Sequence, residues 1–424
     1  MRGLLTILAY VLAFVTLTLG ERIRYDGHQI WRVIPTSRIQ LDFLGILKEE
    51  SQKFQLDFWK EPSALHRPVV FKIPPSKRNE IYIRLGLQGL VPEVTLKDLQ
   101  KNIEKEDALY TQKSFNGLEN FDYSKYHPLS DVNAWMEQMA NSYSNRVELF
   151  NISSSYEGRT ITAMKITGAN SSDSRPGFFF NGGIHAREWI SPATVIYMAA
   201  QLIEQYGKNQ EITDLLDEID WYILPVFNVD GYEYTWTKDR NWRKTRSKHF
   251  LCHGVDPNRN WDWEWCKNGA SKDPCSDTYC GPRPFSESEV KGVADFLNSV
   301  PGRFRAYIDF HSFSQLWMTP WGYTTALPPE FPVQDKCSTT ATDALTAVHG
   351  TEYKHGNIAS TIYTASGSSA DWAFGAAKIL YSTAVELRDT GEYGFLLPAD
   401  QIIPSGEETL QGLLAMAKFI LNNP

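Results

Sequence analysis

Apolar stretches that could cross a membrane are scarce in this 424-residue sequence. The one at residues 4–19 is shorter than the ~20 residues that a spanning helix needs. The sequence also has no G-x-x-x-x-G-K-S/T phosphate loop, no internal repeat and no low-complexity tract. The formal net charge of −8 argues against nucleic acid or an acidic membrane surface as a partner. We therefore expect a globular protein of more than one folding unit, with no nucleic-acid partner and no membrane anchor.

The N-terminus has the anatomy of a secretory signal peptide over residues 1–20. Arg2 precedes the apolar stretch, and the tripeptide "TLG" at 18–20 offers small residues for a cleavage site. A signal anchor that stays in the membrane is the alternative. The glycosylation acceptors Asn151 (N-I-S) and Asn170 (N-S-S) fit the secretory route. We expect a secreted, extracellular protein.

Cysteine is also rare, and four of the five cysteines are clustered: Cys252, Cys266, Cys275 and Cys280. In an exported chain such a cluster predicts two disulfides that staple a loop. Four thiolates that bind zinc are the alternative, although the spacing lacks the paired C-x-x-C of zinc knuckles. Cys337 stands apart, and we expect it to be a buried free thiol.

Residues 21 to about 105 show a pattern of their own. We expect strands at "HQIWRVIPTS", "PVVFKIPP" and "EIYIRLGLQG" and a helix at "IQLDFLGILKEESQ". A charged, exposed helix is predicted to begin at Thr95. Together these elements indicate a small α+β domain. The polar stretch "EKEDALYTQKSFNG", which contains Lys113, is predicted to be an exposed connector that proteases can reach.

From about residue 120 the chain alternates between strands and helices. Apolar runs such as "GFFFNGG", "WYILPVFNVDG", "FRAYIDFHSFS" and "KILYSTAVEL" predict strands of a sheet that is covered on both faces. The last helix is expected to open at Ser405, with Glu408 completing a capping box. Functional groups of such folds follow the strand ends. The residues found there are His185, Asn228, His311 and Glu386.

His185 and Glu188 form an H-x-x-E pair directly after the "GFFFNGG" strand. Two imidazoles and one carboxylate, with a fourth position open to water, are the usual ligands of a hydrolytic zinc site. His311 is the best third ligand, because it too ends an apolar strand. A satisfied polar cluster and an ordinary charged loop are the alternatives. The other histidines lie in the N-terminal region or in polar, turn-like contexts: His28, His66, His127, His249, His253, His349 and His355.

Six segments then converge on one family. They are "GGIHAREWISP", "NWRKTR", "GVDPNRNWD", "FHSFSQ", "IYTASGSSADW" and "AVELRDTGEYGFLLPADQIIP". In this order they closely resemble the signature segments of the pancreatic-type zinc carboxypeptidases, over about residues 120–424. The N-terminal region resembles the activation propeptide of that family.

The resemblance implies a fold, a domain organisation and partners. The fold is an α/β mixed eight-stranded sheet flanked by helices, preceded by a small α+β propeptide domain. The implied domains are a signal peptide at 1–20, a propeptide at 21–113 and a catalytic domain at 114–424. The implied partners are the C-termini of peptides and proteins as substrates and a trypsin-like protease that activates the chain by cutting after Lys113. The chain is expected to be a monomer.

The same resemblance assigns the chemical groups residue by residue. His185, Glu188 and His311 match the ligands of one zinc ion per chain. Glu386, in "AVELRD", matches the general base that activates the attacking water. Arg243, in "NWRKTR", matches the residue that stabilises the oxyanion.

Five further residues match groups that bind the substrate. Asn258 and Arg259 match the pair that grips the terminal carboxylate, and Tyr363 matches the mobile tyrosine that closes over the substrate. Arg187 and Ser312 match groups at more remote subsites. A bidentate arginine explains exopeptidase action, because internal peptide bonds carry no carboxylate to pair with it.

The resemblance is less decisive about which C-terminal residue is removed. The deciding position has aspartate in enzymes that prefer Lys or Arg and a large aliphatic residue in those that prefer apolar residues, and here it is Ala370. The missing acid favours an apolar or aromatic preference (the A type), with a basic or broad preference as the alternative. A second departure is Phe313, where the family usually has tyrosine. The other matched pocket positions are Ile358, Ile362, Gly322, Met318, Ala365 and Ala384.

The resemblance also suggests Cys252–Cys275 and Cys266–Cys280 as the disulfide pairs, although spacing alone leaves the other two connectivities open. Three rival functions remain at this point. A catalytically inactive binding relative would have lost a ligand or the base. A zinc deacylase would lack the Asn258–Arg259 pair. The N-terminal domain could also be a permanent binding module.

Overall fold

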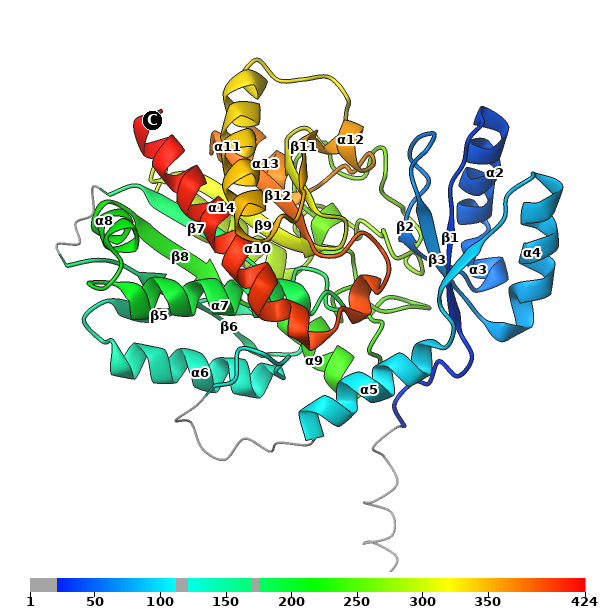
Figure 1. The fold of residues 1–424 in the computed structure, drawn as a ribbon, viewed down its shortest axis with the longest axis horizontal. Helices are drawn as coiled ribbons and strands as arrows, with labels where there is room; N and C mark the ends of the chain where they lie inside the picture. Colours follow the sequence, from blue (N-terminus) through cyan, green and yellow to red (C-terminus); the bar gives the residue numbers. More distant parts are fainter. Residues whose placement is uncertain (1–20, 112–120, 170–174, 424) are drawn as a thin grey trace, which may run out of the picture.

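The structure is a computed structural model that describes residues 21–111, 121–169 and 175–423 (Figure 1). The expected signal peptide, the cleavage site at Lys113 and the acceptor Asn170 lie outside these residues. The ribbon shows a small N-terminal unit beside a larger one that contains the rest of the chain. In the described residues no helix is both long and apolar enough to cross a membrane.

The N-terminal unit is an antiparallel four-stranded sheet in the order β2-β3-β1-β4, with helices on one face (Figure 1). Its strands are β1 (Gln29–Val33), β2 (Asp57–Lys60), β3 (Val69–Ile73) and β4 (Glu93–Leu96). Its helices are α2 (Arg38–Glu49), α3 (Ser51–Phe54), α4 (Arg78–Leu87), α5 (Leu99–Thr111) and the 3-10 turn η1 (Pro75–Lys77). Apolar side chains of α2, α3 and α4 pack on the sheet to form a separate core. The predicted small α+β domain is therefore confirmed.

Two details of this unit differ from the sequence prediction. The segment "EIYIRLGLQG" is helix α4 and not a strand. Its buried side chains are Ile81 and Leu85, four residues apart, whereas Tyr82 and Ile83 are more than half exposed. The β-branched and aromatic residues of this segment suggested a strand, but some of them lie on the solvent-exposed face of the helix. Thr95 lies in β4, and the charged helix begins only at Leu99.

The larger unit is built on an eight-stranded mixed sheet in the order β11-β10-β12-β9-β7-β8-β6-β5. The central strands β12, β9, β7 and β8 are parallel to one another, and antiparallel pairs join β10 to β12, β6 to β8 and β5 to β6. The strands are β5 (Val147–Ser154), β6 (Thr160–Ile166), β7 (Gly177–Asn181), β8 (Asp220–Leu224), β9 (Phe304–Ser312), β10 (Leu316–Thr319), β11 (Lys354–Asn357) and β12 (Tyr381–Leu387). This confirms the mixed eight-stranded sheet.

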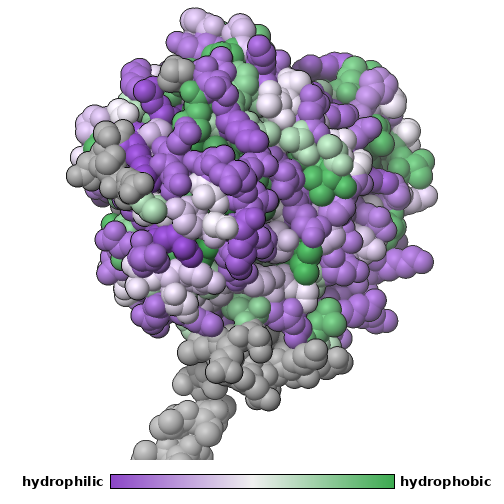
Figure 2. All heavy atoms as spheres, turned by 60° about the vertical axis from the view of Figure 1, so that its left-hand side comes forward, coloured by the Kyte–Doolittle hydropathy of each residue, from purple (hydrophilic) through white to green (hydrophobic). Residues whose placement is uncertain are grey.

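Helices cover both faces of this sheet, so its central strands are buried along almost their whole length. The helices are α6 (Leu129–Ser142), α7 (Ile190–Gln205), α8 (Gln210–Glu218), α9 (Val229–Thr237), α10 (Ser288–Ser299), α11 (Phe331–His349), α12 (Ile358–Thr361), α13 (Ser369–Gly375) and α14 (Ile402–Asn422). Short 3-10 turns are η2 (Pro257–Arg259), η3 (Gly394–Leu396) and η4 (Ala399–Gln401). The face in Figure 2 is mainly hydrophilic, with scattered apolar side chains.

The start of the last helix differs from the prediction. Helix α14 begins at Ile402, so Ser405 and Glu408 lie inside the helix and form no capping box. Both side chains are fully buried. Glu408 instead accepts a hydrogen bond of 2.8 Å from Nε of Arg388, just after β12. Glu408 therefore forms a buried ion pair with Arg388 and does not cap the helix.

Two disulfides join Cys252 to Cys275 and Cys266 to Cys280, which are the pairings that the family resemblance implied. The alternative of a four-thiolate zinc site is therefore wrong. Cys337 is a buried free thiol on α11, as predicted. The loop closed by the second disulfide includes Gly269, whose carbonyl oxygen accepts a hydrogen bond from Arg259.

Candidate active site

The parallel strands bring the candidate side chains to one edge of the sheet. His311 lies near the C-terminal end of β9, and Glu386 pairs with it in register on the neighbouring strand β12. His185 and Glu188 follow β7, the other neighbour of β9. Gly183 adopts a φ of +67°, which glycine tolerates best, and turns the chain out of β7 toward His185. The site is therefore a direct product of the sheet topology.

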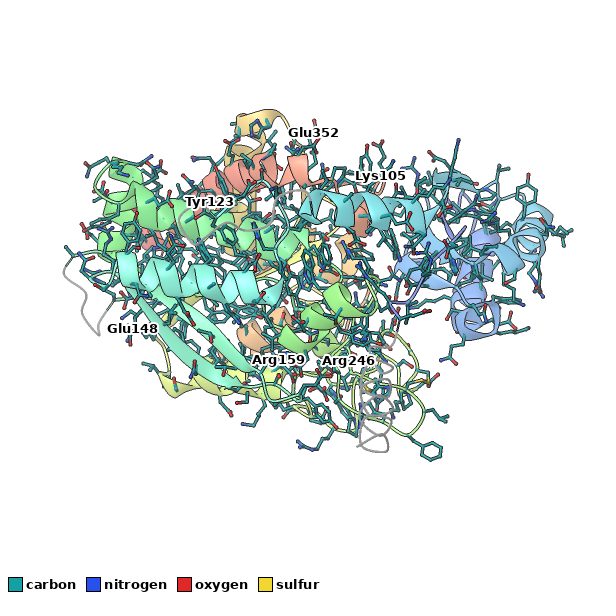
Figure 3. The ribbon with its side chains drawn as sticks, turned by 90° about the horizontal axis from the view of Figure 1, so that it is seen from below. Lys105, Tyr123, Glu148, Arg159, Arg246 and Glu352 are labelled. Atoms are coloured by element: carbon teal, nitrogen blue, oxygen red, sulfur yellow. A yellow bond between two sulfur atoms is a disulfide. The ribbon has the colours of Figure 1, made fainter. Side chains whose placement is uncertain are left out.

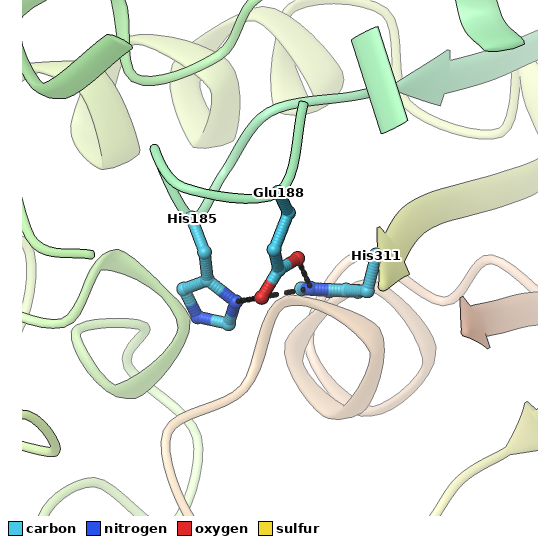
Figure 4. A group of neighbouring side chains, drawn as sticks. All are labelled: His185, Glu188 and His311. Carbon is cyan, nitrogen blue, oxygen red and sulfur yellow. Dashed lines mark hydrogen bonds and ion pairs between the residues drawn. The ribbon is translucent and has the colours of Figure 1, made fainter. Parts of the chain in front are cut away.

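His185, Glu188 and His311 face one another in a buried cluster (Figure 4). Nδ1 of His185 lies 2.8 Å from Oε1 of Glu188, and Nδ1 of His311 lies 3.3 Å from Oε2. The two Nδ1 atoms are 3.2 Å apart. Lone pairs of two imidazoles and a carboxylate repel one another at this distance unless a proton or cation lies among them. Among the residues that the structure describes, this is the one group with the donors and spacing of a metal site, and the donor set fits zinc.

The outer nitrogen of His185 is held by a residue that the sequence analysis did not single out. Nε2 of His185 lies 3.1 Å from Oδ1 of the fully buried Asp256. The other oxygen of Asp256 accepts a hydrogen bond of 2.9 Å from Nη2 of Arg243. Asp256 was missed because it stands in "DPNRN", which looks like an ordinary turn. One carboxylate thus contacts both a candidate metal ligand and the arginine matched to oxyanion stabilisation.

Arg243 is buried close to the metal ligands, with Nη1 3.8 Å from Oε1 of Glu188. Burial acts to lower the pKa of this guanidinium, but the charge of Asp256 outweighs it and raises the pKa further. Arg243 therefore stays positively charged. Its Nε makes no hydrogen bond among the described residues.

Glu386 is also buried, and its Oε2 has no hydrogen-bond partner in the described part of the chain. Burial raises the pKa of this carboxyl to about 8, although His311 acts in the opposite direction. A dication held by the three ligands would lower this pKa. The carboxylate is placed to exchange a proton with a molecule bound beside the ligands.

Asn258 and Arg259 lie on the 3-10 turn η2 next to the ligands. Arg259 is only 2% exposed, and it donates from Nε to the carbonyl oxygen of Gly269 at 2.9 Å. Its guanidinium carbon lies 5.8 Å from the ring centre of Tyr363. Oδ1 of Asn258 accepts a hydrogen bond of 2.8 Å from the backbone N–H of Ser369. The structure thus brings these three matched residues together.

One cavity joins the ligands to an apolar pocket. Its wall includes His185, His311 and Glu386 on one side and Arg259 and Tyr363 on another. The apolar part of the lining consists of Met318, Ile358, Ile362, Ala365, Ala370 and Ala384.

Gly322 lies beside this pocket, where a side chain would not fit. A Cβ at this position would come within 2.9 Å of the carbonyl oxygen of Ala365. The carboxylate of Asp371, next to Ala370, accepts hydrogen bonds from the backbone N–H groups of Gly322 at 2.7 Å and Tyr323 at 3.1 Å. Burial raises the pKa of Asp371 to about 7. The hydrogen-bonding capacity of the Asp371 carboxyl group is therefore already used by backbone N–H groups.

The N-terminal unit docks on the residues matched to remote subsites. Nη1 of Arg187 lies 2.9 Å from Oδ2 of Asp57 on β2, and the same oxygen accepts from the side chain of Asn241. Nζ of Lys60 donates to Oγ of Ser314 at 2.9 Å. A cleft of about 830 Å³ remains between the two units, and Asp57 and Arg243 are among its lining residues.

Arg67 adds two more hydrogen bonds between the units. Arg67, between β2 and β3, donates to the carbonyl oxygens of Thr361 at 2.6 Å and Ser360 at 2.5 Å, directly before Tyr363. Ser312 is buried, and its N–H donates to Oε2 of Glu188 at 3.1 Å, while its hydroxyl has no partner among the described residues. The N-terminal unit thus contacts both Arg187 and the segment that leads to Tyr363.

This fold and this site define a zinc carboxypeptidase with an activation segment. The sequence profile of the zinc carboxypeptidases matches residues 132–412, and that of the carboxypeptidase activation peptide matches residues 31–106. The chain belongs to this family. It is a metallocarboxypeptidase whose activation peptide marks it as the zymogen of an exopeptidase.

Individual relatives agree with the family. Carboxypeptidase A2 of Mus musculus is 42% identical over 405 residues, which cover 94% of this chain and 95% of that protein. Carboxypeptidase B of Astacus astacus is 46% identical over 302 residues, covering 70% of this chain and 98% of that protein. The crystal structure of thrombin activatable fibrinolysis inhibitor has a TM-score of 0.86 at 33% identity and covers 94% of this chain and all of its own.

Proposed function

We propose that the chain is a secreted zymogen that a trypsin-like protease activates by cutting after Lys113. The mature zinc exopeptidase then hydrolyses the last peptide bond of substrates that end in apolar or aromatic residues. In this proposal residues 1–20 are the signal peptide, 21–113 the activation domain and 114–424 the catalytic domain. The enzyme is a monomer with one zinc ion per chain. The supporting observation is a single cavity that joins two members of the metal-donor cluster, His185 and His311, to a buried arginine and an apolar pocket.

The reaction needs an activated water, a stabilised carbonyl oxygen and a proton for the leaving amine. Zinc held by His185, Glu188 and His311 supplies Lewis acidity and lowers the pKa of water. Glu386 accepts the proton of the attacking water and delivers it to the leaving nitrogen. Arg243 lies beside the developing oxyanion, and one such donor contributes about 3–4 kcal/mol.

Exopeptidase action follows from the buried Arg259 and the neighbouring half-buried Asn258. A free C-terminal carboxylate pairs with the guanidinium of Arg259 and accepts from the amide of Asn258. An internal peptide segment would leave Arg259 buried and unpaired, which costs several kcal/mol. Tyr363, beside Arg259, closes over the bound residue. Arg187 contacts the substrate further from its C-terminus, as does Ser312.

The preference for apolar C-terminal residues rests on the pocket lining. Ala370 belongs to an apolar cluster with Met318, Ile358, Ile362 and Ala384 in the cavity wall, and the nearby acid Asp371 already accepts backbone hydrogen bonds. Full burial of a large apolar side chain contributes about 1.5–3 kcal/mol. A lysine or arginine would lose its hydration here without gaining a counter-ion. A basic or broad preference is the second candidate, because a relative called carboxypeptidase B is 46% identical over 302 residues.

A panel of matched peptides tests this proposal. The secreted chain is treated with trypsin, and release of the last residue is followed for peptides that end in Phe, Leu, Lys, Arg and Glu. We expect fast release of Phe and Leu, lost with a chelator and restored with zinc. A preference for Lys or Arg would contradict the pocket argument alone. No release from any peptide, with zinc bound and the N-terminal unit removed, would contradict the enzymatic function.

The activation step has its own test. Intact-mass analysis after limited trypsin treatment should show a stable fragment that begins at Ser114. A chain that stays active without cleavage, or is cut elsewhere without gaining activity, would contradict this assignment and indicate that the N-terminal unit is a permanent module.

A further inference from the structure

Asp309 lies on β9 two residues before His311, so both side chains point to the same face of the strand. Oδ2 of Asp309 is 2.9 Å from Nε2 of His311, and Asp309 is completely buried. We propose that Asp309 is a positioning residue that fixes the ring orientation and the tautomer of His311 for metal binding. The proposal rests on the zinc site proposed above.

The tautomer follows from which groups surround the imidazole. Nδ1 of His311 faces the other two metal donors, so a neutral ring that binds metal there must have its proton on Nε2. Two groups reach Nε2, namely Oδ2 of Asp309 and, at 3.2 Å, Nδ2 of Asn258. The amide nitrogen of Asn258 is itself a donor and cannot accept a proton. Among the described residues that reach Nε2, Asp309 is therefore the one that can accept its hydrogen bond.

The carboxylate of Asp309 is itself held rigidly. Oδ2 accepts a hydrogen bond of 2.6 Å from the hydroxyl of Ser369, and Oδ1 accepts one of 2.7 Å from the side-chain amide of Asn181. Both donors are buried and come from other elements, the N-terminus of α13 and the end of β7. With the imidazole N–H, these donors compensate for burying the charge. The direction of the carboxylate is therefore set by three elements of the fold.

The two metal-binding histidines are then supported in the same way. His185 places Nδ1 at the metal cluster and Nε2 against Asp256, and His311 places Nδ1 at the cluster and Nε2 against Asp309. Ser369 connects this support to the substrate site, because its N–H also donates to Asn258. Carboxylates in this position raise the basicity of the imidazole and fix its ring.

A purely structural role makes a different prediction. If Asp309 only satisfies Asn181 and Ser369, its loss lowers the stability of the fold and leaves zinc affinity unchanged. If it positions His311, its loss weakens zinc binding by about 10–100-fold, as for other residues that orient metal ligands. Zinc affinity of the uncleaved full-length chain, measured by competition with a chromogenic chelator, separates these two roles without relying on catalysis.

Three chains are compared: the unchanged protein, Asp309→Asn and the control Asp220→Asn. Asp220 is equally buried but lies at the start of β8, where it binds Lys165 and Arg303. We expect weaker zinc binding and faster zinc release only for Asp309→Asn. Equal zinc affinity for Asp309→Asn and the unchanged chain would overturn the proposal. Failure of the unchanged chain to bind zinc would instead refute the metal site itself.

A measurement on the unchanged chain covers the case in which Asp309→Asn does not fold. Histidine side chains labelled with ¹⁵N are observed by NMR in the zinc-loaded protein. We expect His311 to show a protonated Nε2 whose hydrogen is shifted downfield and exchanges slowly with water, as for a hydrogen bond to a buried carboxylate. An unprotonated Nε2, or a rapidly exchanging one, would overturn the proposal.

Discussion

The two units of this protein are held together in different ways. Inside the catalytic unit, one continuous apolar core packs on both faces of the eight-stranded sheet. Between the units, by contrast, many contacts are ionic or polar, such as Arg187–Asp57, Arg240–Glu106 and Tyr25–Asp239. Figure 3 shows α5, marked by Lys105, running from the small unit onto the large one.

One apolar cluster also bridges the two units. Trp59 of β2 lies against Phe395, with ring centres 4.8 Å apart, and Phe395 in turn contacts Phe313 beside the metal ligands. The difference between the units suggests their roles. The apolar core holds the larger unit together, whereas the N-terminal unit is docked largely through polar contacts, and one of these occupies Arg187, which we propose contacts the substrate.

The largest effect is expected for a substitution in the catalytic unit, at Glu386. Glu386→Gln keeps the shape of the side chain but removes the proton acceptor, so kcat should fall by about 10²–10⁴-fold. Steady-state kinetics of the trypsin-activated enzyme measure this change, and zinc content is the control. Docking of the N-terminal unit should be unaffected. A variant with nearly unchanged kcat would rule out Glu386 as the general base.

The next effect concerns docking. Asp57→Asn removes the carboxylate that pairs with Arg187, and loss of one partner of a buried ion pair costs about 2–5 kcal/mol. The uncleaved variant should therefore hydrolyse peptides faster than the uncleaved unchanged chain. After trypsin treatment the two enzymes should be identical, because the substituted unit is gone. Equal activities before cleavage would show that this pair does not hold the unit in place.

The same ion pair predicts a pH dependence. Burial acts to raise the pKa of Asp57, but the charges of Arg187 and Lys72 outweigh it and lower the pKa below its usual range. The stabilisation is therefore fully present above the pKa of about 3.9 of a free aspartate, and it is lost as the pH falls through the lower pKa of the docked state. Dissociation of the cleaved but still docked unit, followed by size-exclusion chromatography, should increase in acid. The Asp57→Asn protein should show a weaker dependence, because other carboxylates such as Glu106 still pair across the two units.

A smaller effect is expected in the pocket. Ala370→Asp places a carboxylate among apolar side chains, where it can pair with a cationic substrate side chain for about 1.5–3 kcal/mol. The ratio of kcat/KM for Arg-terminated over Phe-terminated peptides should rise by the corresponding factor of about 10–150. Ala370→Val is the matched control and should keep the apolar preference. An unchanged ratio in the Asp variant would mean that residue 370 does not face the C-terminal side chain.

The smallest effect is expected at Phe313, where the family usually has tyrosine. This ring is buried against Phe395 while the N-terminal unit is docked, so a hydroxyl there would cost about 1–2 kcal/mol if unpaired. Phe313→Tyr should weaken docking slightly and leave the activated enzyme almost unchanged. The rate of inhibition when separated N-terminal unit is added back measures this. A large loss of kcat would show that Phe313 acts in catalysis.

Much of the site was predictable from the sequence because its residues stand at strand ends. His185, Glu188, His311 and Glu386 each follow or end an apolar run, and parallel strands bring such ends to one edge. The motif order then identified the family. The separate N-terminal α+β unit was also predicted from its own pattern of elements.

Other features depend on contacts that no local pattern reveals. Asp57 lies 130 positions before Arg187, and only the docked structure shows that they pair. Asp256 and Asp309 look like turn and strand residues until the imidazoles are seen beside them. Helix α4 was misassigned because tertiary packing buries only one of its faces.

The central claim is that this chain removes C-terminal residues through a metal site and a buried arginine, Arg259, that binds the C-terminal carboxylate of the substrate. The most direct test compares two peptides of identical sequence ending in Phe, one with a free carboxylate and one amidated, after trypsin activation and with or without chelator. We predict release of Phe only from the free peptide and only without chelator, because Arg259 needs the carboxylate. Equal cleavage of the amidated peptide, or cleavage that survives complete removal of zinc, would contradict the account.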